Sequence, residues 1–430
     1  MRSRPSWRAA ERVPRRMTRS AAAPPLDVDV AIIGGGLVGA SLAAALAGTG
    51  VRLLLVESAP FGRSGQPSFD ERTTALGNAS RRIFESLGCW SALAPEAAAI
   101  RVIHVSEAGR FGFARLDAAE QGIDAFGYVV ANRAIGAALW ERLRGAPDLT
   151  LRVPARAEEV AINAATAQLT VAGEGGERQR VTARLLVGAD GADSQVRALA
   201  RIGACVEDYD QVAVVGNVAT DRPHRDIAYE RFTRGGPLAV LPLHDGGLGV
   251  IWARSPREAQ ELLAMDDAAY LSCLQREFGW RAGRFVGAGR RGSYPLKLTR
   301  ATTTVATRAV LIGNAAQALH PVAGQGFNLG LRDAAMLAEA VTGAPGDAGS
   351  TELLRRFEQW RSRDRSALVH FTDGLVRLFA DTRPGAGLLR NLGLLMFDLL
   401  PPAKSALARV SAGFGGPAPR LARGLPLKHV

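Results

Sequence analysis

Three glycines near the N-terminus have the spacing of a turn that binds a dinucleotide. Gly34, Gly36 and Gly39 form a GxGxxG pattern directly after the short β-prone run Asp29–Ile33. In such a turn the first glycine permits the sharp bend, the second lets a pyrophosphate approach the backbone, and the third lets helix and strand pack closely. Glu57 ends the next apolar run and could accept hydrogen bonds from a ribose diol. The pattern predicts a bound dinucleotide but does not choose between NAD and FAD.

Two later segments also join a strand-like run to a polar loop. Asp190 and Gly191 follow the apolar run Arg184–Val187 and are typical of a turn. Gly313 and Asn314 follow a second apolar run in the same way. Both segments therefore place polar groups at the ends of predicted strands, where ligands of α/β proteins bind.

A glycine-rich loop precedes a periodic helix in the last third of the chain. The loop runs from His320 to Gly330 and reads HPVAGQGFNLG. Leu331, Ala334, Ala338 and Val341 then recur on one helical face. The start of a helix presents free N–H groups and the positive end of its dipole, so this loop predicts a second anion-binding terminus.

The elements that position these motifs can be read from the apolar pattern. The stretch from residue 30 to residue 51 is apolar enough to suggest a membrane span, but it has the order of a βαβ unit: strand, glycine turn, helix, strand. The segment Asp70–Leu76 is predicted to open a helix, because Leu76, Ile83 and Leu87 have helical spacing. The segment after residue 352 is predicted to be helical. Its apolar stripes leave two interpretations open, core packing or a surface for a lipid-like tail or partner.

Composition and charge narrow the class of protein. The chain has 430 residues, of which 47% are hydrophobic and 22% charged, as in ordinary globular proteins. The net charge is +12, but the basic excess lies mainly in residues 1–26 and 401–430. This distribution argues against a nucleic-acid groove and leaves the ends either on an anionic membrane surface or in solvent. The 3 cysteines form no CxxC and the 6 histidines no HxxH, so neither a disulfide framework nor a metal site is predicted.

Taken together, the motifs resemble those of the FAD-dependent aromatic hydroxylases of the para-hydroxybenzoate hydroxylase fold. The resemblance covers roughly residues 28–400, and the loop from His320 to Gly330 is similar to the ubiquinone-biosynthesis branch. Within that branch, Glu230–Thr233 and the following Gly236–Pro242 look most like 2-polyprenyl-6-methoxyphenol hydroxylases. The resemblance implies an α/β fold: a Rossmann-like FAD-binding domain, an interleaved β-sheet substrate domain and C-terminal helices.

The same resemblance implies a role for each motif. The first glycine turn holds the ADP part of FAD, Arg72 contacts the dinucleotide, and Arg133 lies near it. The Asp190 turn serves FAD and a transient NAD(P)H. Asn314 stands where most of the wider family has aspartate, so an uncharged amide would meet a ribityl hydroxyl. His320 and Pro321 are the candidate catalytic residues, with loop ordering as the alternative role for the histidine. The implied cofactor-binding residues are Gly34, Gly36, Gly39, Glu57, Arg72, Arg133, Asp190, Gly191, Gly313, Asn314, Gly324, Gln325, Gly326, Phe327 and Asn328.

The implied activity is hydroxylation of a polyprenylated (methoxy)phenol in ubiquinone biosynthesis. NADPH or NADH would reduce FAD, and O2 would react through a flavin C4a-hydroperoxide, which requires a closed apolar pocket. Two alternatives stay open: a non-catalytic FAD-binding subunit of a quinone-biosynthesis complex, and a flavin-dependent reductase or dehydrogenase. The implied location is the cytoplasm, with a peripheral contact to the inner membrane as an open addition, or the mitochondrial matrix in a eukaryote.

The predicted domain organisation follows from the same alignment of motifs. The FAD-binding domain is discontinuous, and a sheet domain is inserted into it because residues 206–285 alternate like strands and lack phosphate motifs. The predicted segments are a disordered basic leader (1–26), the FAD-binding domain (27–100, 127–205 and 286–350), the substrate-binding sheet (101–126 and 206–285), C-terminal helices (351–400) and a basic tail (401–430).

Overall fold

The structure is a computed structural model. It describes residues 23–60, 72–320, 324–344, 346–380, 396 and 418–428. Several sequence predictions lie outside the described residues. They are most of the basic leader, Asp70, Glu71, Pro321, the apolar stripe of residues 388–399 except for Met396, and the tail up to residue 417.

The first sheet contains the glycine turn and has eight strands among the described residues. Its path is β18-β19-β11-β1-β2-β8, and β10 and β9 extend it from β11. The strands are β1 (Ala23–Ile33), β2 (Leu53–Val56), β8 (Leu149–Arg152), β9 (Ala155–Ile162), β10 (Ala167–Gly173), β11 (Arg178–Gly188), β18 (Val305–Ala306) and β19 (Ala309–Leu311). At its centre, β1 pairs in parallel with both β11 and β2. The predicted βαβ unit is therefore confirmed.

Both faces of the first sheet are covered, which explains why its central strands are continuous apolar runs. Val30 and Ile32 belong to a buried cluster shared with helices α1 (Leu37–Leu46) and α8 (Gly326–Thr342). Ala31 and Ile33 belong to a second cluster on the opposite face, shared with β9, β10 and β11. The alternation along β1 places successive side chains in the two clusters.

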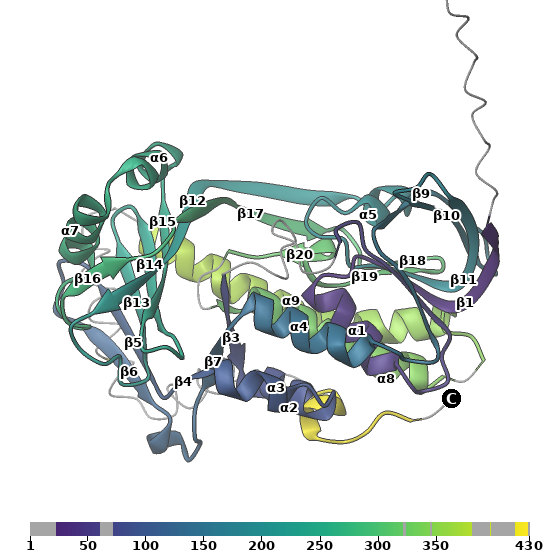
Figure 1. The fold of residues 1–430 in the computed structure, drawn as a ribbon, viewed down its shortest axis with the longest axis horizontal. Coiled ribbons are helices and arrows are strands. Elements are labelled where there is room, and N and C mark those ends of the chain that lie inside the picture. The colour runs from purple at the N-terminus through teal and green to yellow at the C-terminus, as the bar shows by residue number, and fades with distance from the viewer. Residues whose placement is uncertain are drawn as a thin grey trace, which may run out of the picture.

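The second sheet has nine strands among the described residues and contains most of the segments predicted for the substrate domain. Its path is β20-β17-β12-β15-β14-β13-β5-β6, with β16 paired to β12. The strands are β5 (Val102–Glu107), β6 (Phe113–Asp117), β12 (Ala204–Thr220), β13 (Ile227–Thr233), β14 (Gly236–Pro242), β15 (Leu248–Arg254), β16 (Phe285–Ala288), β17 (Gly292–Ala301) and β20 (Gln317–Ala318). The long strands β12 and β17 run side by side between the two ends of the molecule (Figure 1). β17 was expected in the FAD-binding segment 286–350, but its pairing with β12 places it in the second sheet.

One face of the second sheet packs against helices α6 (Pro256–Ala264) and α7 (Asp267–Phe278). Val214, Val250 and Trp252 form a buried cluster there with residues of both helices, including Tyr270 and Leu274. A capping box fixes the start of α6, because Ser255 and Glu258 exchange hydrogen bonds. The opposite face of the sheet is therefore the one left to face a ligand.

A third, small sheet corrects the prediction of a helix at Asp70–Leu76. Residues Thr73–Gly77 form β3, which pairs antiparallel with β7 (Gly127–Ala131), and β4 (Ala98–Ile100) lies on the other side of β7. Helix α2 begins only at Asn78 and ends at Ser86. The helical spacing correctly identified α2, but a partner strand far along the chain decided the conformation of the residues before it.

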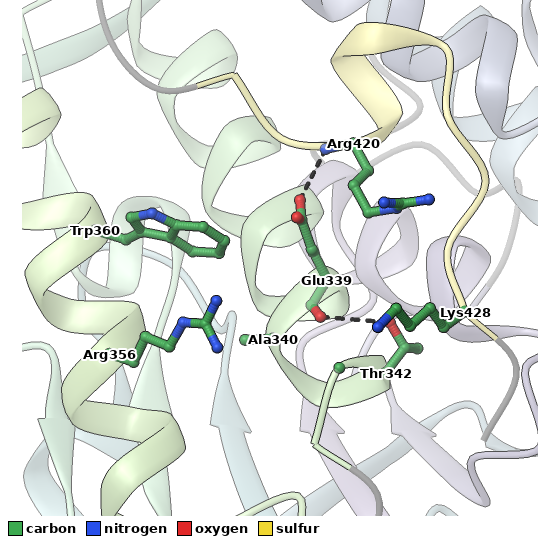
Figure 2. Close-up of a pocket in the computed structure, with 8 residues that line it drawn as sticks. Glu339, Ala340, Thr342, Arg356, Trp360, Arg420 and Lys428 are labelled. Carbon is green, nitrogen blue, oxygen red and sulfur yellow. Dashed lines mark hydrogen bonds between the residues drawn. The ribbon is translucent and has the colours of Figure 1, made fainter.

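Residues 418–428 form a strap that packs against helices α2 and α8 (Figure 1). Leu421 and Ala422 are buried in the cluster that contains α1 and α8. Ser86 Oγ donates to the carbonyl of Leu421 at 2.7 Å, and the backbone N–H of Arg420 donates to Glu339 Oε2 at 2.7 Å. Figure 2 shows Arg420 and Lys428 beside the C-terminal end of α8. This part of the predicted basic tail therefore packs as part of the fold, and contact of its exposed basic side chains with a membrane stays a prediction.

Two further helices pack beside α1 and α8. Helix α4 (Asn132–Leu143) lies alongside α1 in Figure 1, and α9 (Thr351–Ala380) passes behind both. The start of α9 confirms the predicted helical segment after residue 352. No helix among the described residues is both long enough and apolar enough to cross a membrane.

Candidate functional site

The predicted motifs meet at one edge of the first sheet. In the strand register Ile33 is opposite Val56 and Gly188, and Gly188 is opposite Leu311. These four residues end parallel strands, so the loops that follow them emerge side by side. The edge therefore brings together the glycine turn, Glu57, the Asp190 loop and the turn at Gly313, as expected for a dinucleotide site at the carboxyl ends of parallel strands.

Steric contacts explain two of the three glycines in the first turn. Gly34 has a φ of 103°, and a Cβ there would lie 2.4 Å from the carbonyl oxygen of Ala189. A Cβ on Gly39 would lie 1.9 Å from the carbonyl oxygen of Gly34. Gly36 is the N-cap of α1, and no side chain caps the helix or places an acid in its first turn. The N–H groups at the start of α1 are thus left for an anionic ligand.

Glu57 holds the glycine turn, and its contact with a ribose stays a prediction. Its Oε2 accepts the N–H of Gly35 at 2.7 Å, and its Oε1 accepts the N–H of Ala59 at 2.7 Å. The side chain is buried. A buried carboxylate held by two backbone donors is fixed in position before any ligand arrives, which lowers the cost of ordering it on binding.

The Asp190 loop is organised by its own side chains. Asp190 accepts hydrogen bonds from Ser194 Oγ at 2.5 Å and from the N–H of Val196 at 3.0 Å, at the start of α5 (Gln195–Leu199). Arg197 donates to the carbonyls of Ala192 and Ala315, and the second bond ties this loop to the turn after Gly313. Gly191 has a φ of 90° and open space beside it. Asp190 thus shapes the loop, and a direct contact with FAD or NAD(P)H stays a prediction.

The turn after β19 is pressed against the first turn of α1. Gly313 has a φ of 59°, and a Cβ there would lie 3.1 Å from the side chain of Val38. Asn314 follows in the short 3-10 turn Gly313–Ala315 and is exposed. An exposed amide beside the start of α1 is available to a ribityl hydroxyl, as the resemblance implies.

The loop before α8 is held to β3 by a buried amide. Asn328 Oδ1 accepts the N–H of Gly77 at 2.8 Å and Ser80 Oγ at 2.6 Å, and Asn328 Nδ2 donates to the carbonyls of Ala75 and Gly324. The side chain therefore orders the loop, and contact of the loop's backbone with the cofactor stays a prediction.

The start of α8 resembles that of α1. Gln325 is its N-cap, and neither a side-chain cap nor an acid occupies its first turn. Phe327 stacks on Phe84 with ring centroids 6.3 Å apart. Gly326 has no atom within 4 Å of the position of a Cβ. Gly324 has a φ of 60°. The start of α8 thus has the uncapped N–H groups that the predicted second anion-binding terminus requires.

The two predicted arginines flank neighbouring strands at the same end of the small sheet. The β3–β7 pairing places Thr73 opposite Ala131, so Arg72 and Arg133 emerge near each other. The guanidinium of Arg72 lies 5.6 Å from the ring centroid of Tyr294 on the second sheet. Arg133 forms an ion pair with Glu96 at 2.9 Å. A contact of either arginine with the cofactor stays a prediction.

The open face of the second sheet is largely apolar and meets the loop that begins at His320. Tyr209, Val215, Ile251 and Tyr294 lie on this face around buried alanines and a leucine. His320 Nε2 lies 3.3 Å from Gln211 Oε1, and its ring meets Tyr209 edge-on at 5.2 Å. These contacts connect the sheet to the cofactor side of the fold. An apolar surface with a few polar groups is typical of a small-molecule site.

His320 is buried and electrically neutral at physiological pH. Burial lowers the pKa of His320 from 6.5 to about 4. A neutral imidazole can pass a proton only through its tautomers or by brief protonation, so the geometry favours ordering of the loop over storage of a proton. Its neighbour Pro321 lies outside the described residues.

The pKa of His320 predicts an acid-sensitive stability. The unfolded chain binds a proton at His320 between pH 6.5 and about 4, whereas the folded chain does not, so the free energy of unfolding should fall as pH falls through this range. The full contribution is present above about pH 6.5, and the loss is at most about 3 kcal/mol. Denaturant unfolding at pH 7 and pH 5 measures it. His320→Gln should flatten the profile, and the exposed His370→Gln should not; an unchanged pH dependence in His320→Gln contradicts the assignment.

The sequence did not reveal a buried ion network behind the site. Asp333 and Arg361 are almost completely buried and form an ion pair at 2.7 Å. Arg332 pairs with Asp364 at 3.1 Å, and Arg365 lies 3.4 Å from Asp333. The only available signal was the pair Arg332–Asp333 within an otherwise apolar helical stripe. Charged residues within a helix usually face solvent, so this pair gave only a weak indication of burial.

The residues at the edge of the first sheet fit FAD. Two helices start there without side-chain caps, and steric contacts exclude larger residues at Gly34 and Gly39. The free N–H groups suit a pyrophosphate at α1 and the electron-rich end of an isoalloxazine at α8. Among the described residues, no group of three or more His, Cys, Asp or Glu side chains could hold a metal ion.

A parallel sheet with these two helix termini, roofed by a second sheet, defines a dinucleotide-binding flavoprotein of the para-hydroxybenzoate hydroxylase type. The chain belongs to the FAD-binding domain family, whose model matches residues 27–372. The fold predicted from the sequence is therefore confirmed.

The chain is also similar to individual enzymes and solved structures. The chain is 37% identical to ubiquinone hydroxylase UbiL of Rhodospirillum rubrum. The matched region has 406 residues and covers 93% of each protein. It is 34% identical over 375 residues to 3-demethoxyubiquinol 3-hydroxylase of Escherichia coli, covering 85% of this chain and 94% of that enzyme. The solved structure of p-nitrophenol 4-monooxygenase PnpA from Pseudomonas putida superposes with a TM-score of 0.75 at 19% identity and covers 92% of this chain and 99% of that one. The last likeness concerns the fold alone.

Proposed function

We propose that this protein is an FAD-dependent monooxygenase that hydroxylates a polyprenylated (methoxy)phenol in ubiquinone biosynthesis, with NADPH or NADH as reductant. One observation carries the proposal. The loop that begins at His320 leads into the uncapped start of α8, and it contacts the apolar face of the second sheet through Gln211. A site with a flavin on one side and an apolar roof on the other suits a phenol ring with a greasy tail. The names of the relatives at 37% and 34% identity support the same substrate class.

The protein would bind FAD and the substrate, orient them toward each other and exclude water from the space between them. When bound, FAD supplies the redox chemistry, in which it accepts electrons from the nicotinamide and passes them to O2. The N–H groups at the start of α8 stabilise negative charge on the ring, because they are uncapped and aligned with the helix dipole. Tyr209, Ile251 and Tyr294 line the apolar side and exclude water from the reacting centre. Neutral His320 holds the loop beside them.

The test is oxygen-dependent product formation by the FAD-loaded full chain. With NADPH or NADH and a short-chain alkyl methoxyphenol, we expect a product that is heavier by one oxygen atom in air and absent under nitrogen. Labelled 18O2 should place its label in that product. A product formed equally well under nitrogen favours a reductase or dehydrogenase. A yellow protein that consumes neither NADPH nor NADH favours a non-catalytic FAD-binding subunit.

Membrane contact and a biosynthetic complex belong to the same proposal. The basic residues near the C-terminus support contact with an anionic membrane surface, and Arg423 and Lys428 are exposed on the strap. Assembly with other enzymes that act on ubiquinone precursors is part of the proposal, because the names of the relatives place them in ubiquinone chemistry. Co-sedimentation with vesicles containing an anionic phospholipid, compared with neutral vesicles, tests the first point.

A further inference from the structure

A single buried carboxylate joins the turn at Gly313 to helix α9. Asp333 Oδ2 accepts the backbone N–H of Gly313 at 3.2 Å and Gln317 Nε2 at 3.2 Å. Asp333 Oδ1 accepts Arg361 Nε at 2.7 Å and Arg365 Nε at 3.4 Å. Asp333 is 0% exposed and Arg361 is 1% exposed. One oxygen therefore holds the turn, and the other is held by α9.

This turn lies where three segments touch at backbone distance. A Cβ on Gly330 of α8 would lie 3.0 Å from the Cα of Gly313 and 2.8 Å from the side chain of Val38 on α1. Arg197 holds the turn from the other side through the carbonyl of Ala315 at 3.0 Å. The turn is thus held by α8, by α1 and by Arg197, and the hydrogen bond to Asp333 fixes its remaining side. The exposed Asn314 belongs to the same turn, so its position depends on that bond.

The charge on Asp333 is maintained by the arginines of α9. Burial alone would raise the pKa of Asp333, but Arg365 and Arg361 outweigh it and hold the pKa below its ordinary value. The carboxylate is therefore ionised, and its bond from the Gly313 N–H is charge-assisted, which makes it stronger than a bond between neutral groups. Without both arginines a buried carboxylate of this kind would be strongly unfavourable.

Helix α9 is itself anchored to the strand that leads into the turn. Arg365 Nη1 donates to Thr304 Oγ1 at 2.7 Å. Glu358 Oε1 accepts Thr303 Oγ1 at 2.9 Å and the N–H of Thr304 at 3.1 Å. Thr304 precedes β18 and β19, and β19 runs directly into Gly313. The same helix thus holds both the approach to the turn and the turn itself.

We infer that Asp333 is a positioning residue for the cofactor: charged and fixed by Arg361 and Arg365 of α9, it holds the Gly313–Gln317 turn in the conformation that binds FAD. The inference rests on the proposed function, since it takes FAD as the ligand of this turn. It assigns a role in cofactor affinity to a helix that contributes no predicted cofactor contact.

The experiment compares two variants that each remove one carboxylate from the same network. Asp333→Asn weakens the bond to the turn, whereas Asp364→Asn breaks pairs with Arg332 and Arg361 but touches no residue of the turn. FAD binding to the stripped full chain is measured by quenching of flavin fluorescence, and the bound flavin by visible circular dichroism. Asp333→Asn should raise the Kd for FAD about tenfold or more, as expected for the loss of a charge-assisted bond, and change the visible dichroism. Asp364→Asn should leave both near wild type.

A second variant keeps the test decisive if Asp333→Asn does not fold. The double variant Asp333→Asn/Arg365→Met removes one charge of each sign, so the buried network stays balanced. It should fold and still bind FAD about tenfold more weakly. Wild-type affinity in either variant overturns the inference, and so does equal weakening by Asp364→Asn, which would indicate a merely structural role. Failure of the wild-type chain to bind FAD would instead overturn the proposed function.

Discussion

Replacement of Gly39 by alanine is expected to abolish the binding of FAD. The new Cβ would lie 1.9 Å from the carbonyl oxygen of Gly34, and because the backbone fixes the position of a Cβ, no side-chain rotation can relieve this contact. Helix α1 would have to move away from the glycine turn, which separates its free N–H groups from the pyrophosphate position. We expect at least a hundredfold rise in the Kd for FAD, which corresponds to about 2.7 kcal/mol. Fluorescence titration and the ratio of flavin to protein absorbance measure it.

The matched control is the same substitution where space is free. Gly374 lies in α9 with no atom within 4 Å of a Cβ position. Gly374→Ala should retain full flavin content and gain a little helix stability, about 0.5–1 kcal/mol. Gly326→Ala separates a steric clash within the protein from a direct loss of contact with FAD. Because its Cβ meets no protein atom, the stripped protein should keep its stability while the affinity for FAD falls. A Gly39→Ala protein that is purified yellow and fully active would refute the assignment of the turn.

Replacement of Arg361 by methionine should have the largest effect on stability. The guanidinium is 1% exposed and bonds to Asp333, to Asp364 and to the carbonyl of Leu329. Methionine fills similar space but leaves two carboxylates with reduced compensation in a buried site. Removal of one partner from a buried ion pair lowers the free energy of unfolding by about 3–5 kcal/mol. Unfolding in guanidinium chloride, monitored by near-ultraviolet circular dichroism, measures the change in the free energy of unfolding.

The control for this effect lies on the same helix. Arg355 pairs with Glu352 at 3.1 Å, and both side chains are largely exposed. An exposed pair of this kind contributes about 0–1 kcal/mol, so Arg355→Met should be nearly neutral. Similar losses in Arg355→Met and Arg361→Met would show that burial of the network does not determine its contribution.

The parts of the fold that sequence reasoning predicted are those encoded locally. The unit from Asp29 to Glu57 contains a strand, a glycine turn and a helix within one stretch, so its pattern alone identified it. The short apolar runs Val212–Val215 and Leu248–Trp252 were likewise predicted to be strands from their local composition, and both lie in strands. The family resemblance correctly identified the two-sheet architecture, because its motifs lie at the strand ends that the fold aligns.

The features that escaped prediction depend on contacts between distant segments. Thr73–Gly77 became a strand because β7 pairs with it, although its spacing continues into α2. β17 joined the second sheet because of its long pairing with β12. Arg361 and Asp333 looked like surface charges on helices, and only the packing of α8 against α9 buries them together. No local pattern contains that information.

The buried strap at residues 418–428 has a consequence for how the protein is made. Leu421 and Ala422 share a hydrophobic cluster with Val30 and Leu42, so the core that begins to form around the first strand is completed by residues synthesised nearly four hundred positions later. While the ribosome is still translating, the surfaces of α2 and α8 that receive the strap stay uncovered. The core around the first strand is therefore completed only after residues 421 and 422 have left the ribosome, and chaperones have an exposed apolar surface to bind until then.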